Sequence, residues 1–204
     1  MTETNLQNST LNSGIIQTEK SLANLSAEGF SQVKRTKSIA REVTLNGLLI
    51  ALVFVSTYLI QIRLPISLNG GLIHMGNVAL FSTALLLGKR RGAIAGAFGM
   101  GIFDLVSGWV VWAPFTFVVR GVMGYLIGRL SEGEKPRWWQ TPLAILVGGI
   151  WMIGGYYVTE ALLYGNWMAP VTSIPGNLTQ IVLGTVIALP LSRALRPIRE
   201  RYRD

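Results

Sequence analysis

Apolar runs alternate with short polar or cationic segments along most of the chain. The apolar runs fall at 44–62, 72–88, 92–109, 114–130, 142–163 and 171–194. About 20 apolar residues in a helix cross the ~30 Å of hydrocarbon in a bilayer. We therefore predict an all-α integral membrane protein, a bundle of six transmembrane helices.

The cationic residues support this count and give an orientation. Of the 18 Lys and Arg residues, all but Arg63 and Arg120 lie in four clusters, at 20–41, 89–91, 129–137 and 193–203. Cationic loops stay on the cytoplasmic side, so two crossings separate each cluster from the next and both termini are predicted to be cytoplasmic.

The composition agrees with this class. Half of the residues are hydrophobic and only 14% are charged, which is low for a soluble domain. The net charge of +8 falls at predicted membrane borders. We therefore expect membrane lipid as a partner and no nucleic acid.

Three segments are expected. Residues 1–38 are rich in Ser, Thr, Asn and Gln, which predicts a disordered cytoplasmic tail, with an amphipathic helix at 15–30 as the alternative. A membrane domain follows at 39–196, and a basic cytoplasmic C-terminus at 197–204. The span at 72–88 is expected to begin below the outer surface, with the loop 61–71 folded inward over it.

Small residues and prolines predict details of the helices. Gly92 and Gly96 are four residues apart, as are Gly124 and Gly128, so both pairs predict close contact between helix backbones. The pair Pro175-Gly176 near its outer end and Pro190 near its inner end are expected to interrupt the last span.

Four titratable residues lie within or against the apolar spans: His74, Asp104, Arg120 and Glu160. A charge at the membrane centre costs at least ~3 kcal/mol, so such groups usually face a polar interior. Asp104, Arg120 and Glu160 all lie near the predicted outer ends of their spans. This favours a pocket open to the outside over a proton or ion relay; the alternative is a structural network in which Arg120 pairs with Asp104 or Glu160.

Aromatic and amide side chains at the same level complete the predicted pocket. Glu160 lies between two tyrosines on one helix face, each four residues away. Trp residues here also suit an interfacial belt. The predicted substrate-binding residues are His74, Asn77, Asp104, Trp112, Arg120, Tyr156, Glu160, Tyr164, Asn166, Asn177 and Gln180.

Catalytic and nucleotide-binding motifs are absent from the sequence. There is no Walker loop, Gly-x-Ser-x-Gly elbow, His pair or cysteine, so we expect no metal, no cofactor and no enzymatic activity. Two alternatives remain: an intramembrane enzyme that uses Asp104 and Glu160 as an acid dyad, and a membrane scaffold whose charges serve packing only.

Four motifs in order resemble the S components of energy-coupling-factor (ECF) vitamin transporters, in the riboflavin-type branch. They are GLIHMGN at 71–77, LLLGKRRGAIAG at 85–96, FDLVSGW at 103–109 and WAPFTFVVRG at 112–121. The resemblance covers residues 41–195. It implies a six-helix bundle in the bacterial cytoplasmic membrane that binds a vitamin from the outside and docks on a transmembrane coupling subunit with two ATPase subunits.

The resemblance also bears on docking and substrate. It implies docking through small residues on the first helix, which Gly47 and Ala51 match, although Val55 follows. Asn77 stands where many relatives carry an acid, which weakens the case for a cationic ligand. We expect a pyridine or pyrimidine such as pyridoxine or hydroxymethylpyrimidine, with pantothenate or riboflavin as alternatives; Arg120 would suit the carboxylate of pantothenate.

Overall fold

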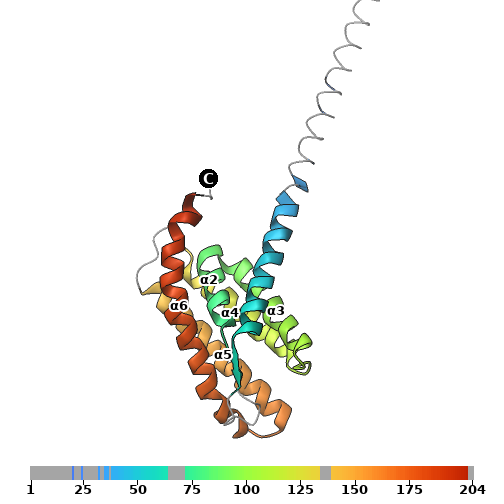
Figure 1. Cartoon of the computed structure of the whole chain (residues 1–204), viewed down its shortest axis with the longest axis vertical. Coiled ribbons are helices and arrows are strands. Elements are labelled where there is room, and N and C mark those ends of the chain that lie inside the picture. The colour runs from blue at the N-terminus through green and yellow to red at the C-terminus, as the bar shows by residue number, and fades with distance from the viewer. Residues whose placement is uncertain are drawn as a thin grey trace, which may run out of the picture. The chain divides into compact units, whose positions relative to one another are not determined.

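The computed structural model describes residues 20, 24, 32, 35, 36, 38–63, 72–133 and 139–201, with side chains up to 197 (Figure 1). The chain divides into two compact units, Met1–Leu45 and Asn46–Asp204. Most of the predicted tail, including most of its alternative helix at 15–30, lies outside the described residues. The same holds for residues 64–71, which are most of the predicted loop 61–71.

The described residues form six α-helices, a short hairpin and one 3-10 turn. The elements are the helix Ser38–Leu59, β1 (Gln61–Arg63), β2 (Leu72–His74), α2 (Gly76–Leu87), α3 (Lys89–Val106), α4 (Ala113–Ser131), α5 (Gln140–Tyr164), η1 (Ala169–Ser173) and α6 (Ile174–Arg201). The prediction of an all-α bundle of six helices is confirmed. The basic C-terminal segment predicted at 197–204 begins within α6.

Three of the described helical segments are long and apolar enough to cross a membrane: Ser38–Leu59, Gln140–Tyr164 and Ala169–Pro197. The other three helices are too short or too charged to meet this criterion. Helix α2 has only 12 residues, α3 begins with three cations, and α4 carries Arg120 and Arg129. Large apolar side chains such as Leu146, Ile150 and Val186 are exposed, which is typical of helices that face lipid.

Helix α2 is the central helix of the second unit and packs against α3, α4 and α6. Nine of its twelve residues are buried, which a helix without a charged residue allows. The prediction that this span is helical from position 72 is wrong. Residues 72–74 form β2, which pairs antiparallel with β1 so that Gln61 lies opposite His74.

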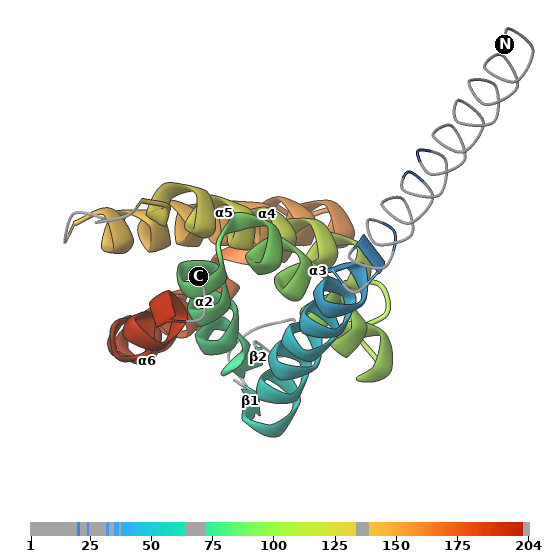
Figure 2. The same cartoon turned by 90° about the horizontal axis from the view of Figure 1, so that it is seen from above.

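The pairing of β1 with β2 gives this non-helical backbone its hydrogen-bond partners. The two strands satisfy each other's backbone groups, and the N–H of Met75 extends the ladder by donating to the carbonyl of Ile60 over 3.1 Å. Figure 2 shows β2 leading directly into α2. At this junction the N–H of Gly76 donates to Nδ1 of His74 over 3.2 Å. The chain therefore enters α2 from a strand, while most of the loop 61–71 that is expected to fold inward lies outside the described residues.

Helices α3 and α4 cross with their backbones nearly in contact. A Cβ added to Gly92 would lie 2.9 Å from the carbonyl oxygen of Gly124, and one added to Gly96 would lie 2.7 Å from that of Arg120. The predicted close contact through both glycine pairs is confirmed, because Gly128 likewise faces the backbone of Lys89.

The cationic end of the α3–α4 pair lies far from Asp104. Lys89 and Glu132 form an ion pair of 3.0 Å, which joins the cluster 89–91 to the end of α4 beside the cluster 129–137. Asp104 lies 15 residues further along α3, about 22 Å away at 1.5 Å per residue. The acidic group and the cationic cluster thus occupy opposite ends of the same helix.

Helix α5 ends at Tyr164 and is followed by Gly165, whose φ of +62° is the left-handed conformation that stops many helices. The chain then turns through η1 into α6. The expected interruptions at Pro175-Gly176 and at Pro190 are wrong, because α6 continues through both. Pro175 lies in the first turn of α6, where a missing backbone N–H costs little.

Candidate functional site

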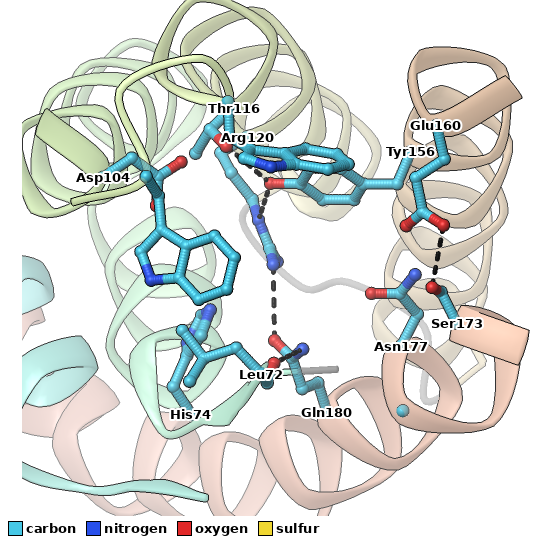
Figure 3. A pocket seen from close by; sticks show the side chains of 13 residues that line it. Leu72, His74, Asp104, Thr116, Arg120, Tyr156, Glu160, Ser173, Asn177 and Gln180 are labelled. Carbon is cyan, nitrogen blue, oxygen red and sulfur yellow. Dashed lines mark hydrogen bonds between the residues drawn. The ribbon is translucent and has the colours of Figure 1, made fainter. Parts of the chain in front are cut away.

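One pocket gathers most of the predicted polar residues (Figure 3). It encloses about 620 Å³, its open mouth included. Six parts of the second unit contribute to it: β2, the end of α3 with the following turn, α4, α5, η1 and α6. The lining residues are Leu72, His74, Asp104, Trp109, Trp112, Thr116, Arg120, Tyr156, Glu160, Ser173, Gly176, Asn177 and Gln180.

Arg120 extends from α4 into the centre of this pocket and is only 2% exposed. Its Nε donates to the hydroxyl of Tyr156 over 3.1 Å, and its Nη2 donates to Oε1 of Gln180 over 3.3 Å. Its Nη1 donates to Oδ1 of Asn77 and to the sulfur of Met152. Neutral groups therefore orient this cation.

Arg120 is not held by a direct ion pair with Asp104 or Glu160. None of the acceptors within hydrogen-bond distance of Arg120 in the described chain is a carboxylate. The predicted alternative, in which Arg120 pairs directly with Asp104 or Glu160, is therefore not the observed arrangement. The charges still interact over longer range, because Arg120 attracts the Asp104 carboxylate.

A chain of hydroxyls connects Arg120 to Asp104. The Tyr156 hydroxyl, which accepts from Arg120, donates to Oγ1 of Thr116 over 3.1 Å. Thr116 in turn lies beside the Asp104 carboxyl group. The Tyr156 ring also stacks close to the guanidinium, with 5.2 Å from Cζ of Arg120 to the ring centroid. Asp104, Thr116, Tyr156 and Arg120 thus form one connected group.

Glu160 belongs to a second polar group. Its Oε2 accepts a hydrogen bond from the Ser173 hydroxyl over 2.8 Å, and Asn177 lines the pocket next to them. Figure 3 shows Asp104 and Glu160 on opposite sides of Arg120. A shared-proton dyad needs two adjacent carboxyl groups. The enzyme alternative therefore has no geometric support.

Gln180 and His74 form the wall on the hairpin side. The Gln180 side chain donates to the backbone carbonyl of Leu72 over 2.6 Å while it accepts from Arg120. Nδ1 of His74 accepts the Gly76 N–H, so a neutral imidazole carries its proton on Nε2. Both side chains have fixed donor and acceptor directions.

Three predicted residues do not line the pocket. Asn77 is fully buried beneath Arg120. Tyr164 is half exposed and packs on Trp112, with ring centroids 6.4 Å apart. Asn166 is exposed, and its side chain accepts the backbone N–H of Met168 over 2.8 Å. The other eight, His74, Asp104, Trp112, Arg120, Tyr156, Glu160, Asn177 and Gln180, line it together.

Five lining residues were not among the predicted site residues: Leu72, Trp109, Thr116, Ser173 and Gly176. Two of these carried a usable signal. Thr116 lies four residues before Arg120 and so shares its helix face, and Ser173 lies four residues before Asn177. Uncharged hydroxyls are common in membrane helices, which is why neither stood out.

A helical membrane protein with a polar pocket confined to one end of the bundle is suited to binding a small solute rather than to conducting it. The chain belongs to the family of ECF-type riboflavin transporter S components, whose family model matches residues 37–197. The predicted resemblance is thereby confirmed. The protein is a membrane component of this transporter class, and such components work with an ECF module of membrane and ATPase subunits.

Two relatives show the range of this similarity. The chain is 30% identical over 161 residues to the thiamine precursor transporter HmpT of Lactococcus lactis subsp. cremoris, covering 79% of this chain and 89% of that protein. It is 32% identical over 135 residues to an uncharacterized protein of Pyrococcus woesei, covering 66% of this chain and 89% of that protein.

Proposed function

We propose that this protein is the substrate-binding S component of an ATP-driven importer and that it captures the pyrimidine precursor of thiamine, hydroxymethylpyrimidine. The family and the thiamine precursor transporter that it resembles support this class of substrate. The observation that carries the proposal is the mixed character of the one-sided pocket: a cation, two acids and two amides around aromatic rings.

This mixture suits a flat, uncharged, polar ring. Trp112 and Tyr156 offer aromatic surfaces, with ring centroids 6.5 Å apart. Gln180 and Asn177 both donate and accept hydrogen bonds, and Asp104 accepts them. An aminopyrimidine with a hydroxymethyl group has donors and acceptors around its rim and little else, so its rim and its faces are both matched.

Riboflavin is the second candidate, because the matching family is described by that vitamin. Pantothenate is less well matched. Its carboxylate would have to draw Arg120 away from Asn77, Tyr156 and Gln180, and it would approach two acids. Pyridoxine shares the flat hydroxylated ring and belongs in the same test.

The proposal includes an orientation and a partner surface. The pocket faces outward from the cytoplasmic membrane of a bacterial cell, and both termini face the cytoplasm. A transmembrane coupling subunit with two ATPases docks at Gly47 and Ala51. In support, both residues are exposed on the helix Ser38–Leu59, and a Cβ added to Gly47 would meet nothing within 4 Å. Internal packing of the second unit therefore does not require a small residue at Gly47.

Thermal unfolding of the purified full chain with a panel of ligands tests the substrate. The panel contains hydroxymethylpyrimidine, the thiazole precursor of thiamine, pyridoxine, riboflavin and pantothenate. A ligand at 100 times its Kd adds ~2.7 kcal/mol of stability, which is readily measured. Stabilisation by hydroxymethylpyrimidine at the lowest concentration is expected; stabilisation by riboflavin alone would replace the pyrimidine proposal.

A further inference from the structure

Arg120 has one more N–H donor than it has acceptors in the described chain. A guanidinium carries five N–H groups and can only donate. Its Nε group donates to Tyr156, its two Nη1 groups donate to Asn77 and to methionine sulfur, and one Nη2 group donates to Gln180. The second Nη2 N–H has no acceptor among the described residues, although the side chain is only 2% exposed.

Gln180 has a second donor of the same kind. Because Arg120 can only donate, the atom of the Gln180 amide that faces it is the oxygen, and the amide nitrogen therefore faces the carbonyl of Leu72. One N–H of this nitrogen donates to Leu72 over 2.6 Å; within the described part of the chain, the other has no acceptor. Gln180 lines the pocket and is only 4% exposed, so this donor is buried too.

The two donors are close enough to meet at one ligand atom. Nη2 of Arg120 lies 3.3 Å from Oε1 of Gln180, and Nε2 is bonded to the same carbon as that oxygen. Figure 3 shows the guanidinium pointing at the amide in the middle of the pocket. We call Nη2 of Arg120 and Nε2 of Gln180 the donor pair. A buried donor without an acceptor costs free energy, so the donor pair favours a ligand that brings an acceptor to it.

The geometry of the donor pair discriminates among acceptors. A pyrimidine ring nitrogen has a single lone pair in the ring plane and so accepts well from only one donor. A hydroxyl oxygen has two acceptor lone pairs and matches two donors. A carboxylate in bidentate contact needs two parallel N–H groups of one guanidinium, whereas Arg120 has a single N–H beyond its bonds to described residues. An uncharged oxygen therefore fits the donor pair best.

We propose that the donor pair binds the hydroxymethyl oxygen of the pyrimidine, and that this contact selects the thiamine precursor over thiamine itself. This rests on the proposed function. In thiamine, the methylene group on the pyrimidine ring carries a thiazolium cation in place of the oxygen. The donor pair would then face a positive charge and no acceptor, which the permanent charge of Arg120 makes unfavourable.

Calorimetry on the full-length protein tests the inference with four ligands. They are hydroxymethylpyrimidine, its deoxy analogue with a methyl group in place of hydroxymethyl, its formyl analogue, and thiamine. Wild-type protein is expected to bind the deoxy analogue and thiamine at least ~100-fold more weakly than hydroxymethylpyrimidine, because both buried donors are left without an acceptor. The formyl oxygen accepts but cannot donate, so the formyl analogue should bind within about tenfold of hydroxymethylpyrimidine.

Three variants assign the contact, through the ratio of the affinities for hydroxymethylpyrimidine and its deoxy analogue. Gln180→Met removes one member of the donor pair, and the Nη2 N–H that it frees still points at the former amide, so the ratio should fall below about tenfold. Arg120→Lys keeps the charge but loses the planar fork, and should lower the ratio similarly. Asn177→Ala removes another lining amide of α6 and should keep the ratio within about threefold of wild type.

The outcomes distinguish the two proposals. Equal binding of hydroxymethylpyrimidine and its deoxy analogue, or of hydroxymethylpyrimidine and thiamine, would overturn the role of the donor pair and leave the proposed function standing. So would a ~100-fold loss with the formyl analogue, since the hydroxyl would then act as a donor. A ratio that falls only in Asn177→Ala would also overturn it. If wild type binds none of the pyrimidines, the proposed function fails, and this inference fails with it. If the variants at Gln180 and Arg120 do not fold, the four ligands on wild type still decide.

Discussion

Gln180 donates a hydrogen bond to the backbone carbonyl of Leu72 across 2.6 Å, and so ties α6 to strand β2. The other end of the same carboxamide accepts from Arg120. One side chain therefore connects three elements that are distant in sequence: the hairpin, α4 and α6. It also fixes the position of the cation at the centre of the pocket.

Replacement of Gln180 by Met tests this connection. Met keeps the length of the side chain but leaves the Leu72 carbonyl and one N–H of Arg120 without their partner. We expect the variant to lose about 2–6 kcal/mol in the free energy of unfolding, from ~1–3 kcal/mol for each of the two buried unsatisfied groups. Thermal unfolding in detergent measures the loss. The neighbouring Thr179→Ala, which removes only an exposed bond to Pro175, should be nearly neutral.

Tyr156→Phe tests the chain of hydroxyls between Arg120 and Asp104. The ring stays beside Trp112, but Nε of Arg120 loses an acceptor and Oγ1 of Thr116 loses a donor. The expected losses are ~1–3 kcal/mol in stability and up to about tenfold in ligand affinity. Tyr157→Phe is the matched control, because that hydroxyl bonds the Trp167 carbonyl at the surface. Equal effects in both variants would contradict the assigned role.

Gly96→Ala tests the crossing of α3 and α4. The new methyl group would lie 2.6 Å from Cδ1 of Leu80 and 2.7 Å from the carbonyl oxygen of Arg120, and the backbone cannot yield as a flexible side chain can. A loss of ~1–3 kcal/mol is expected. Gly154→Ala on α5 has nothing within 4 Å and should be neutral or stabilising by up to ~1 kcal/mol. Differential scanning fluorimetry on the two variants makes the comparison.

The ion pair between Lys89 and Glu132 predicts a small pH dependence. The hydrogen bond from the Lys89 ammonium lowers the pKa of Glu132. A lowered pKa stabilises the folded state above the usual pKa of Glu, and this contribution is lost as the pH falls through the lowered value. Both side chains are about one-third exposed, at 32% and 37%, so the effect is at most ~0.5 kcal/mol. The difference in Tm between wild type and Glu132→Gln should be present at pH 7 and vanish well below ~pH 4.3.

Leu at Gly47 or Ala51 tests the proposed docking surface. Both positions are exposed, so the larger side chain should leave ligand binding and stability of the purified protein unchanged. Uptake of labelled ligand by cells should fall at least ~10-fold, because a small-residue surface admits close approach of a partner helix and Leu does not. Leu at Val55, which is also exposed and already large, serves as the control. Normal uptake in the Gly47 and Ala51 variants would remove the docking proposal.

The helices could be predicted because a lipid-spanning segment needs a long apolar run. The start of α2 could not, since Leu72-Ile73-His74 is as apolar as the helix that follows and only its pairing with β1 makes it a strand. The gathering of eight polar residues also followed from sequence, because isolated polar groups in a membrane are costly. The partners of Arg120 did not follow. Sequence gives charge and helix face, whereas the choice of Asn77 over an acid depends on side-chain directions in three dimensions.

The glycine crossing of α3 and α4 has a mechanical consequence for the pocket. Where two backbones touch, neither helix can slide or rotate without a steric clash. Helices α3 and α4, which carry Asp104, Thr116 and Arg120, therefore move together as one rigid unit. Any widening that admits or releases a solute then has to come from the facing side, where Ser173 of η1 bonds Glu160 of α5 and Gln180 of α6 bonds strand β2.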